Sequence, residues 1–464
     1  MLHKEKLLPE KTYIEKTYLE RGGASLDLSD TELTEIFSGA LSKALADLNN
    51  SGPVIILPPD ITRFHSRGGF FTDLAAGIIK PRLGAVMPAL GSHVAMTGAE
   101  LDRMFPNTPK DKFLAHDWRN DVTELGRLEE DFVENVCDGV VRYDWPCQVN
   151  KLLRKDGPGS GGFSLVLSIG QVVPHEVAGM ANHAKNIFVG TGGKEAIDKS
   201  HFAGAAYGME KMMGRADTPV RALFDEGLRR FAKELPPILW VLTVVGTRTD
   251  SEAVAANKAR GSLAVRGLFV GFGRECFEKA AALAREVNVN IMDEPIKKAV
   301  VYLEPEEFRT TWIGNKAIYR TRMAIADGGE LLILAPALER FGEDRGIDAL
   351  IRKHGYRPGR EIIARAKNDD ELKRNLSAAA HLIHGSSEGR FTVRYCTASS
   401  DAAITKKEIE SVGFEWGSLE EAEARYDIKK LGLGWNTNPD GERFFFIPNP
   451  GMGLWAEKRR FYNA

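Results

Sequence analysis

The chain repeats one pattern: a short apolar segment suited to a β-strand, then a polar loop, then a helix. Residues 53–57 (PVIIL), 83–90 (LGAVMPAL) and 163–169 (FSLVLSI) are apolar segments of this kind, and charged or imidazole groups follow each of them. Strands that alternate with helices form parallel sheets, because each helix crosses back over the face of the sheet. The first half of the chain is therefore predicted to be a doubly wound α/β domain.

A second series of the same kind begins near residue 299. Strands are predicted at 299–303 (AVVYL) and 330–334 (ELLIL), with a helix at 315–326 between them. At 464 residues the chain exceeds the size of one ordinary core. We therefore predict two α/β domains, residues 1–275 and 276–464, with an active-site cleft between them.

Composition and charge narrow the class of protein. The net charge is −2, and 27% of the residues are charged, with both signs interspersed, which is not typical of nucleic-acid or anionic-membrane binding. The first residues are charged and lack the apolar core of a signal peptide. The four cysteines are scattered without a CxxC pair, as in a protein with reduced thiols. We expect a cytoplasmic protein with no nucleic-acid or membrane partner.

Chemistry-bearing residues concentrate between residues 172 and 202, just beyond a predicted strand. This stretch contains His175, His183, His201, two glycine turns and Lys185. In α/β proteins, ligands gather beyond the carboxyl ends of such strands. The histidine spacings of eight and eighteen match no common zinc pattern. The residues around Lys185 are mostly small or apolar, which would lower its pKa and suit a lysine that carries a covalent group.

Loops after two earlier strands contain further candidate residues. Arg63, in the run Asp60-Ile-Thr-Arg63, can grip a carboxylate or phosphate, or can form an ordinary surface ion pair. His93 is equally a candidate acid or base and a candidate structural histidine. His116 and Asp117 are placed to orient each other, or His116 is simply a structural histidine. The glycine-rich runs at 157–162 and 190–194 lack the spacing of a dinucleotide or P-loop motif.

These motifs occur in one order and at plausible spacings between about residue 50 and residue 335. The elements are Asp60-Ile-Thr-Arg63, Leu90-Gly-Ser-His93, His116-Asp117, Pro174-His175, Ala178-Gly179, Lys185, His201, Trp312 to Lys316 (WIGNK) and Gly328-Gly329. As a set they resemble the lactate racemase family, the nickel-pincer-nucleotide-dependent 2-hydroxyacid racemases and epimerases.

The resemblance implies a role for each candidate residue. Lys185 would carry the cofactor, a pyridinium mononucleotide with two sulfur-containing arms, and His201 would be the protein ligand to nickel. His93 and His175 would be the acid/base pair, one for each face of the substrate. The further residues implied in binding the nucleotide or the substrate carboxylate are Asp60, Arg63, Trp312 and Lys316. The implied partners are a small 2-hydroxy acid and, transiently, cofactor-synthesis proteins.

The resemblance implies that a 2-hydroxy acid is inverted by hydride abstraction and return. One departure concerns the substrate: Asn182 and His183 stand where many relatives carry small flexible residues. We therefore predict a longer, polyhydroxylated acid such as an aldonate. The alternatives are a zinc-dependent or dehydrogenase-like α/β enzyme that uses His93 and His175, and a non-catalytic cofactor- or ligand-binding relative.

Overall fold

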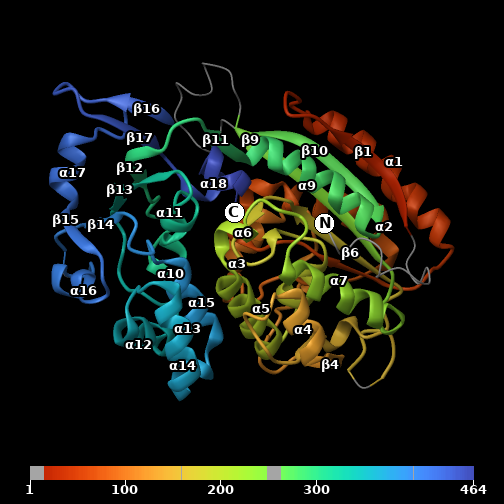
Figure 1. The fold of residues 1–464 in the computed structure, drawn as a ribbon. Coiled ribbons are helices and arrows are strands. Elements are labelled where there is room, and N and C mark those ends of the chain that lie inside the picture. The colour runs from red at the N-terminus through yellow and green to blue at the C-terminus, as the bar shows by residue number, and fades with distance from the viewer. Residues whose placement is uncertain (1–14, 158, 248–262, 401, 464) are drawn as a thin grey trace.

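The protein is built around two six-stranded sheets, each covered by helices. The computed structural model describes residues 15–157, 159–247, 263–400 and 402–463, and Figure 1 shows its ribbon. One sheet has the order β1-β10-β9-β6-β2-β3, and the other has the order β15-β14-β13-β12-β17-β16. The predicted α/β fold class is confirmed.

The first sheet is mixed rather than wholly parallel. β2, β3, β6 and β9 pair in parallel, whereas β10 pairs antiparallel with both β9 and β1. Its strands are β1 (Lys16–Gly22), β2 (Val54–Leu57), β3 (Leu83–Val86), β6 (Leu165–Gln171), β9 (Ile238–Thr247) and β10 (Leu263–Phe272). The carboxyl ends of β2, β3 and β6 therefore meet at one edge of the sheet.

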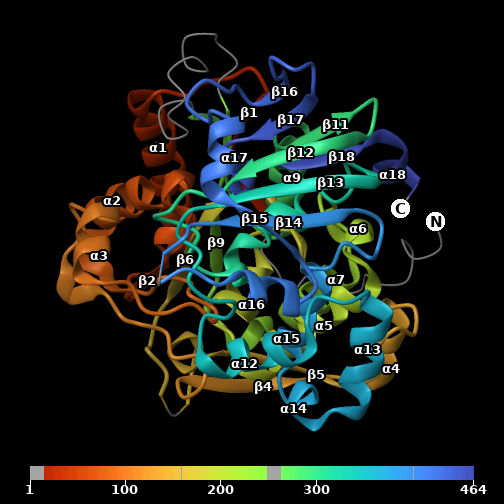
Figure 2. The same cartoon turned by 90° about the vertical axis from the view of Figure 1, so that its left-hand side faces the viewer.

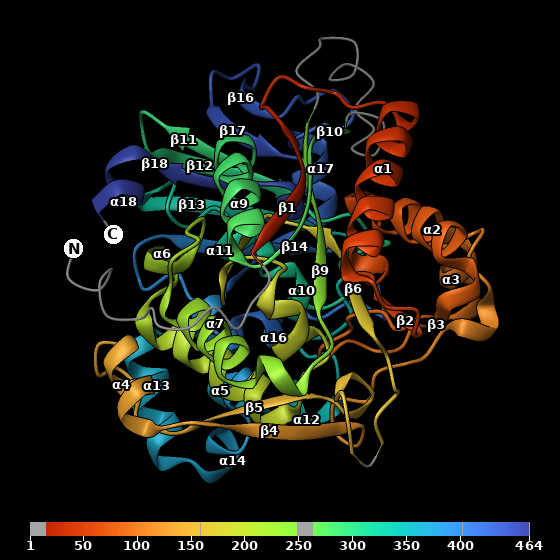
Figure 3. The ribbon, with the colours of Figure 1, turned by 90° about the vertical axis from the view of Figure 1, so that its right-hand side faces the viewer.

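Helices cover both faces of this sheet. α1 (Asp30–Leu48) and α2 (Gly68–Ile79) cover one face, and α5 (Lys194–Tyr207), α7 (Pro219–Phe231) and α9 (Arg274–Asn288) cover the other (Figure 3). Residues alternate between these faces along each strand, as in β2, where Ile56 faces α1 and α2 and Ile55 faces the opposite core. The remaining elements of this half are α3 (Gly98–Met104), β4 (Val122–Leu128), α4 (Glu130–Val136), β5 (Trp145–Asn150), β7 (Pro174–His175), β8 (Gly179–Met180) and α6 (Met209–Met212).

The second sheet is parallel except for its edge strand β16, and Figure 2 looks onto it. Its strands are β12 (Ile296–Tyr302), β13 (Ile325–Ala335), β14 (Thr392–Thr397), β15 (Glu415–Ser418), β16 (Gly434–Thr437) and β17 (Arg443–Ile447). Four helices stand between β13 and β14 in the chain, α12 (Arg345–His354), α13 (Gly359–Asn368), α14 (Asp370–Lys373) and α15 (Leu376–His384), followed after β14 by α16 (Lys406–Ser411) and α17 (Leu419–Arg425).

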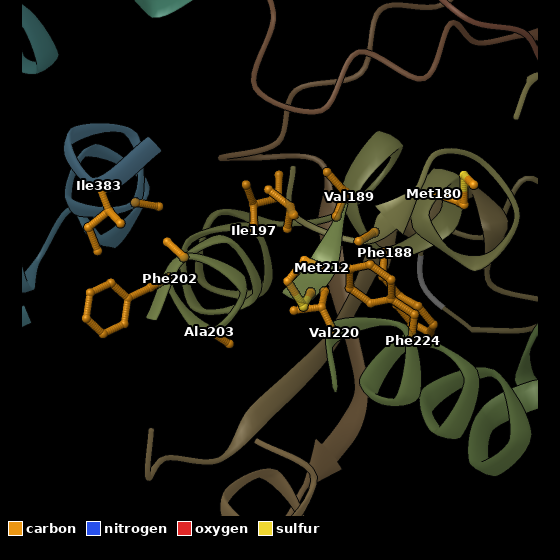
Figure 4. Packing of buried hydrophobic residues seen from close by; sticks show 14 of the residues in the cluster. Met180, Phe188, Val189, Ile197, Phe202, Ala203, Met212, Val220, Phe224 and Ile383 are labelled. Atoms are coloured by element: carbon orange, nitrogen blue, oxygen red, sulfur yellow. The ribbon is translucent and has the colours of Figure 1, made fainter. Parts of the chain in front are cut away.

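The two halves meet along helices and at the chain's end. α15 packs on α5, and Figure 4 shows Ile383 of α15 beside Ile197 and Phe202 of α5. β18 (Leu454–Glu457), which precedes α18 (Lys458–Asn463), pairs in parallel with β11 (Val289–Met292). A domain boundary after residue 275 falls inside α9, which packs on β9 and β10. The division at 275 and 276 stays a prediction.

Three predicted elements differ from the structure, the third being a strand that the apolar start of residues 113–117 (FLAHD) also predicts. The helix expected at 315–326 is replaced by two single turns, α10 (Thr311–Gly314) and α11 (Lys316–Tyr319), because Ile325 already pairs with Ile296 in the sheet. The strand expected at 83–90 ends at Val86, two residues before a proline that cannot donate to the ladder. The segment at 113–117 forms one isolated bridge and no strand.

Candidate functional site

The eight side chains to which the resemblance gives a role line one cavity of about 200 Å³. They are Asp60, Arg63, His93, His175, Lys185, His201, Trp312 and Lys316. The first six come from the loops after β2, β3 and β6 and from α5, and the last two come from α10 and α11. Segments far apart in the sequence are thus brought to one place between the two sheets, at the edge where ligands of α/β proteins usually bind.

Asp60 and His93 form a hydrogen-bonded pair on one side of the cavity. Asp60 caps the short turn Ile61–Ser66 by accepting from the backbone N–H of Thr62 at 3.2 Å. Its other oxygen lies 2.6 Å from Nδ1 of His93. Burial raises the pKa of Asp60, but His93 and the hydrogen bonds outweigh this and lower it to about 2. An ionised Asp60 accepts a hydrogen bond from Nδ1–H, so the Nε2 of the neutral His93 ring keeps its lone pair.

His175 has the opposite tautomer. Its Nδ1 accepts a hydrogen bond from the backbone N–H of Val177 at 3.1 Å, so this nitrogen carries no proton. The imidazole is buried, and burial lowers the pKa of His175 well below its usual value. The neutral ring therefore carries its proton on Nε2. The cavity thus has a proton acceptor in His93 and a hydrogen-bond donor in His175.

Lys185 stands at the start of a π-turn, Asn186–Gly190, that follows two residues with positive φ, Asn182 (70°) and His183 (56°). Burial, and next the charge of Arg63, lower the pKa of Lys185 to about 8. A substantial fraction of the amine is therefore neutral near pH 8, which is the nucleophilic form.

His201 lies on α5 and turns one nitrogen toward its own helix. Its Nδ1 lies 2.7 Å from the carbonyl oxygen of Ile197, to which it donates, so Nε2 keeps a lone pair. A histidine held in this way presents a nitrogen suited to a metal ion. In the part of the chain that the structure describes, no group of three or more His, Cys, Asp or Glu side chains is placed to hold a metal ion.

His183 and His116, to which the resemblance gives no role, support the loops instead. His183 packs against Trp240 and Phe277, with ring centroids 4.3 Å and 5.1 Å away, and is absent from the cavity lining. Of the two residues that depart from many relatives, Asn182 therefore lines the cavity and His183 does not.

His116 does not pair with Asp117. Its Nε2 lies 3.0 Å from the carbonyl oxygen of Gly192, and Asn150 donates to its Nδ1 at 2.9 Å. It thereby holds the glycine turn that leads into α5. Asp117 accepts instead from the backbone of Arg119 and from Asn120.

The second half of the chain closes the cavity with aromatic and cationic groups. The Trp312 ring lies on His381 at 4.5 Å, and His381 Nε2 is 2.9 Å from the hydroxyl of Tyr356. Lys316 lies 3.7 Å from Glu307, and burial lowers its pKa. Sequence reasoning missed several polar residues of the cavity lining, among them Glu176, Tyr319, Arg320, Ser377, His381 and His384. The spacing of the two histidines on α15 was the one available signal.

Comparison with known proteins supports the fold. No family model and no curated protein matches the chain. A crystal structure of a protein from Thermotoga maritima aligns with a TM-score of 0.71 at 23% identity, covering 93% of this chain and all of the other. The lactate racemase apoprotein from Thermoanaerobacterium thermosaccharolyticum aligns with a TM-score of 0.65 at 16% identity, covering 95% of this chain and 94% of the other. The protein therefore has a lactate-racemase-like fold.

Among the described helices, none combines the length and the apolar character needed to cross a membrane.

Proposed function

We propose that this protein is a racemase or 2-epimerase of 2-hydroxy acids that uses a nickel-pincer nucleotide bound to Lys185. The observation that carries the proposal is the convergence of all eight predicted residues, from Asp60 to Lys316, on one cavity. The likeness to the lactate racemase apoprotein supports the same class through the fold.

The residues present fit this cofactor. Lys185 offers a buried amine with a lowered pKa for covalent attachment, and His201 offers one free imidazole nitrogen. A pincer cofactor brings its other nickel ligands with it, so a single protein nitrogen is enough, and mixed sulfur and nitrogen ligation suits nickel(II). When bound, the cofactor supplies a reversible acceptor for the hydride on the substrate's Cα.

The chain's own groups would handle the proton and the charge of the substrate. Arg63 and Lys316 hold the carboxylate from opposite sides of the cavity. Nε2 of His93 accepts the hydroxyl proton of one enantiomer, and Asp60 stabilises the imidazolium that forms. On the opposite face of the substrate, His175 donates a hydrogen bond from Nε2–H to the substrate's hydroxyl oxygen. For His175 to act as a base toward the second enantiomer, its proton must move to Nδ1, which breaks the hydrogen bond from Val177.

The substrate is a 2-hydroxy acid in this proposal. The prediction of a longer, polyhydroxylated acid now depends on Asn182, which lines the cavity beside Lys185.

Intact-protein mass spectrometry with metal analysis tests the proposal, on protein produced together with the cofactor-synthesis proteins. We expect an added mass that maps to Lys185 and about one nickel per chain. Lys185→Ala should lose the adduct and the activity, whereas Lys211→Ala, which removes an exposed lysine, should keep both.

Three other outcomes would contradict the proposal. Retained activity in Lys185→Ala would exclude this lysine as the attachment site. An unmodified lysine with bound zinc would favour the zinc-dependent or dehydrogenase-like alternative. A complete adduct without turnover of any 2-hydroxy acid would favour a non-catalytic carrier.

A further inference from the structure

Arg320 is a buried arginine at the edge of the cavity, and two of its three guanidinium nitrogens make no hydrogen bond. It follows α11, only 2% of its surface is exposed, and it lines the same cavity as Arg63 and Lys316. Its Nε and Nη1 atoms are buried and make no hydrogen bond. Tyr319 forms a side-chain hydrogen bond with the guanidinium, but the two unpaired nitrogens are still unfavourable in a buried cation. An anionic ligand in the cavity would offset this cost.

Like charges surround Arg320. Burial, and next the charge of Arg320, lower the pKa of Arg63. Lys316 is affected by both guanidiniums, although burial is the main cause of its lowered pKa. Three cations from the two halves of the chain therefore repel one another across one cavity, and an anion placed among them would relieve this repulsion.

The acidic groups nearby do not offset these charges. Asp60 is already bonded to His93 and Thr62, and Glu307 lies beside Lys316. Glu176 interacts electrostatically with Arg320, yet it forms no hydrogen bond to Nε or Nη1. The carboxylate of Glu176 is thus shared between Arg63 and Arg320. In the proposed function the substrate carboxylate is held by Arg63 and Lys316, so Nε and Nη1 of Arg320 still have no acceptor.

The position of Arg320 indicates which molecule supplies that partner. Arg320 lines the same cavity as His93 and His175, so it borders the region where the substrate would react. We infer that Arg320 binds a second carboxylate on the side chain of the substrate, which makes the substrate class a 2-hydroxy dicarboxylate. This inference rests on the proposed function. A carboxylate with a full negative charge binds more strongly beside Arg63, Lys316 and Arg320 than the neutral hydroxyl groups of an aldonate do.

Isothermal titration calorimetry on the purified full-length protein tests the inference with four ligands. 2-Hydroxypropanoate and 2-hydroxybutanedioate share the 2-hydroxy acid group and differ in the side-chain carboxylate. Gluconate adds hydroxyl groups only, and ribose 5-phosphate stands in for the phosphate end of a nucleotide. Wild-type protein should bind the dicarboxylate about 10- to 100-fold more tightly than 2-hydroxypropanoate.

Three variants test whether Arg320 causes the preference for the dicarboxylate over 2-hydroxypropanoate. Arg320→Met should remove the preference for the dicarboxylate and change 2-hydroxypropanoate binding less than about twofold. Arg320→Lys, which keeps the charge without the forked geometry, should keep part of the preference and serves where the Met variant does not fold. Arg322→Met is the matched control: Arg322 is also buried, but it is paired with Glu210 and lies outside the cavity lining, so it should leave the preference unchanged.

Several results would overturn the inference. If Arg320→Met weakened the binding of both acids equally, Arg320 would bind the carboxylate that the two acids share or would maintain the shape of the pocket. Tightest binding of gluconate or of ribose 5-phosphate, lost in Arg320→Met, would assign the site to hydroxyl groups or to the cofactor phosphate. Loaded enzyme that inverts 2-hydroxypropanoate as well as the dicarboxylate would overturn this inference and leave the proposed function standing. Dicarboxylate binding that depends on Arg320, without turnover of any 2-hydroxy acid, would overturn the proposed function alone.

Discussion

The two walls of the cavity differ in how their residues are held. On the first wall, Asp60, His93 and His175 lie in loops at strand ends, where backbone and side-chain hydrogen bonds set each tautomer. On the second wall, His381 and His384 lie inside a helix and are fully enclosed, and burial lowers their pKa values to about 3 and about 4. Loops at strand ends thus present reactive nitrogens, whereas the helices of the second wall present neutral rings and cations that shape the pocket.

The comparison predicts the largest effect for His93. His93→Asn removes the proton acceptor and should lower turnover about 10²- to 10⁴-fold, because general base catalysis contributes on that scale. The adduct on Lys185 and the nickel content should stay at wild-type levels. Rates with both enantiomers of the substrate, together with the intact mass, measure this. Near-normal turnover in His93→Asn would contradict the view that the first wall supplies the reacting groups and the second wall only shapes the pocket.

His175 should respond to the kind of replacement. Its neutral ring is held as an Nε2–H donor, and a glutamine offers an N–H at a similar reach. We therefore expect His175→Gln to lose about tenfold in one direction of the reaction and His175→Leu to lose about 10²-fold. Initial rates measured separately for each enantiomer compare the two variants. Equal and complete loss in both would show that His175 acts as a base and not mainly as a donor.

Replacing Lys185 should stabilise the protein that lacks its cofactor. Its pKa is about 8 in the folded chain against an ordinary 10.5, so below pH 8 the folded state holds a proton that it binds poorly. Lys185→Met should raise the free energy of unfolding by about 3 kcal/mol at pH 7. The gain should shrink between pH 8 and 10.5 and vanish above that range. Denaturant titrations across this range measure it, and a gain that does not change with pH would contradict the lowered pKa.

The first wall was predictable from the sequence for a physical reason. A strand such as 53–57 is recognisable by its apolar run, and the polar residues after it must lie at the sheet edge, so Asp60 and Arg63 could be placed without coordinates. The second wall was not. Arg320 looks like an ordinary charged residue, and it becomes distinctive only when the short turns of α10 and α11 bury it beside Arg63. Helices α12 to α15 were not predicted at all.

The smallest effect concerns the contact that joins the walls. Ser377, on α15, donates a hydrogen bond of 2.5 Å to Asp198 on α5, the helix that carries His201. Ser377→Ala should weaken the docking of the two helices by about 1 kcal/mol, the usual net value of one hydrogen bond. Because the reacting groups of the first wall stay in place, KM should rise about fivefold with kcat nearly unchanged. Steady-state kinetics checks this, and Ser387→Ala, outside the cavity lining, is the control. A fall in kcat without a change in KM would mean that α15 positions His201 and takes part in the chemistry of the first wall.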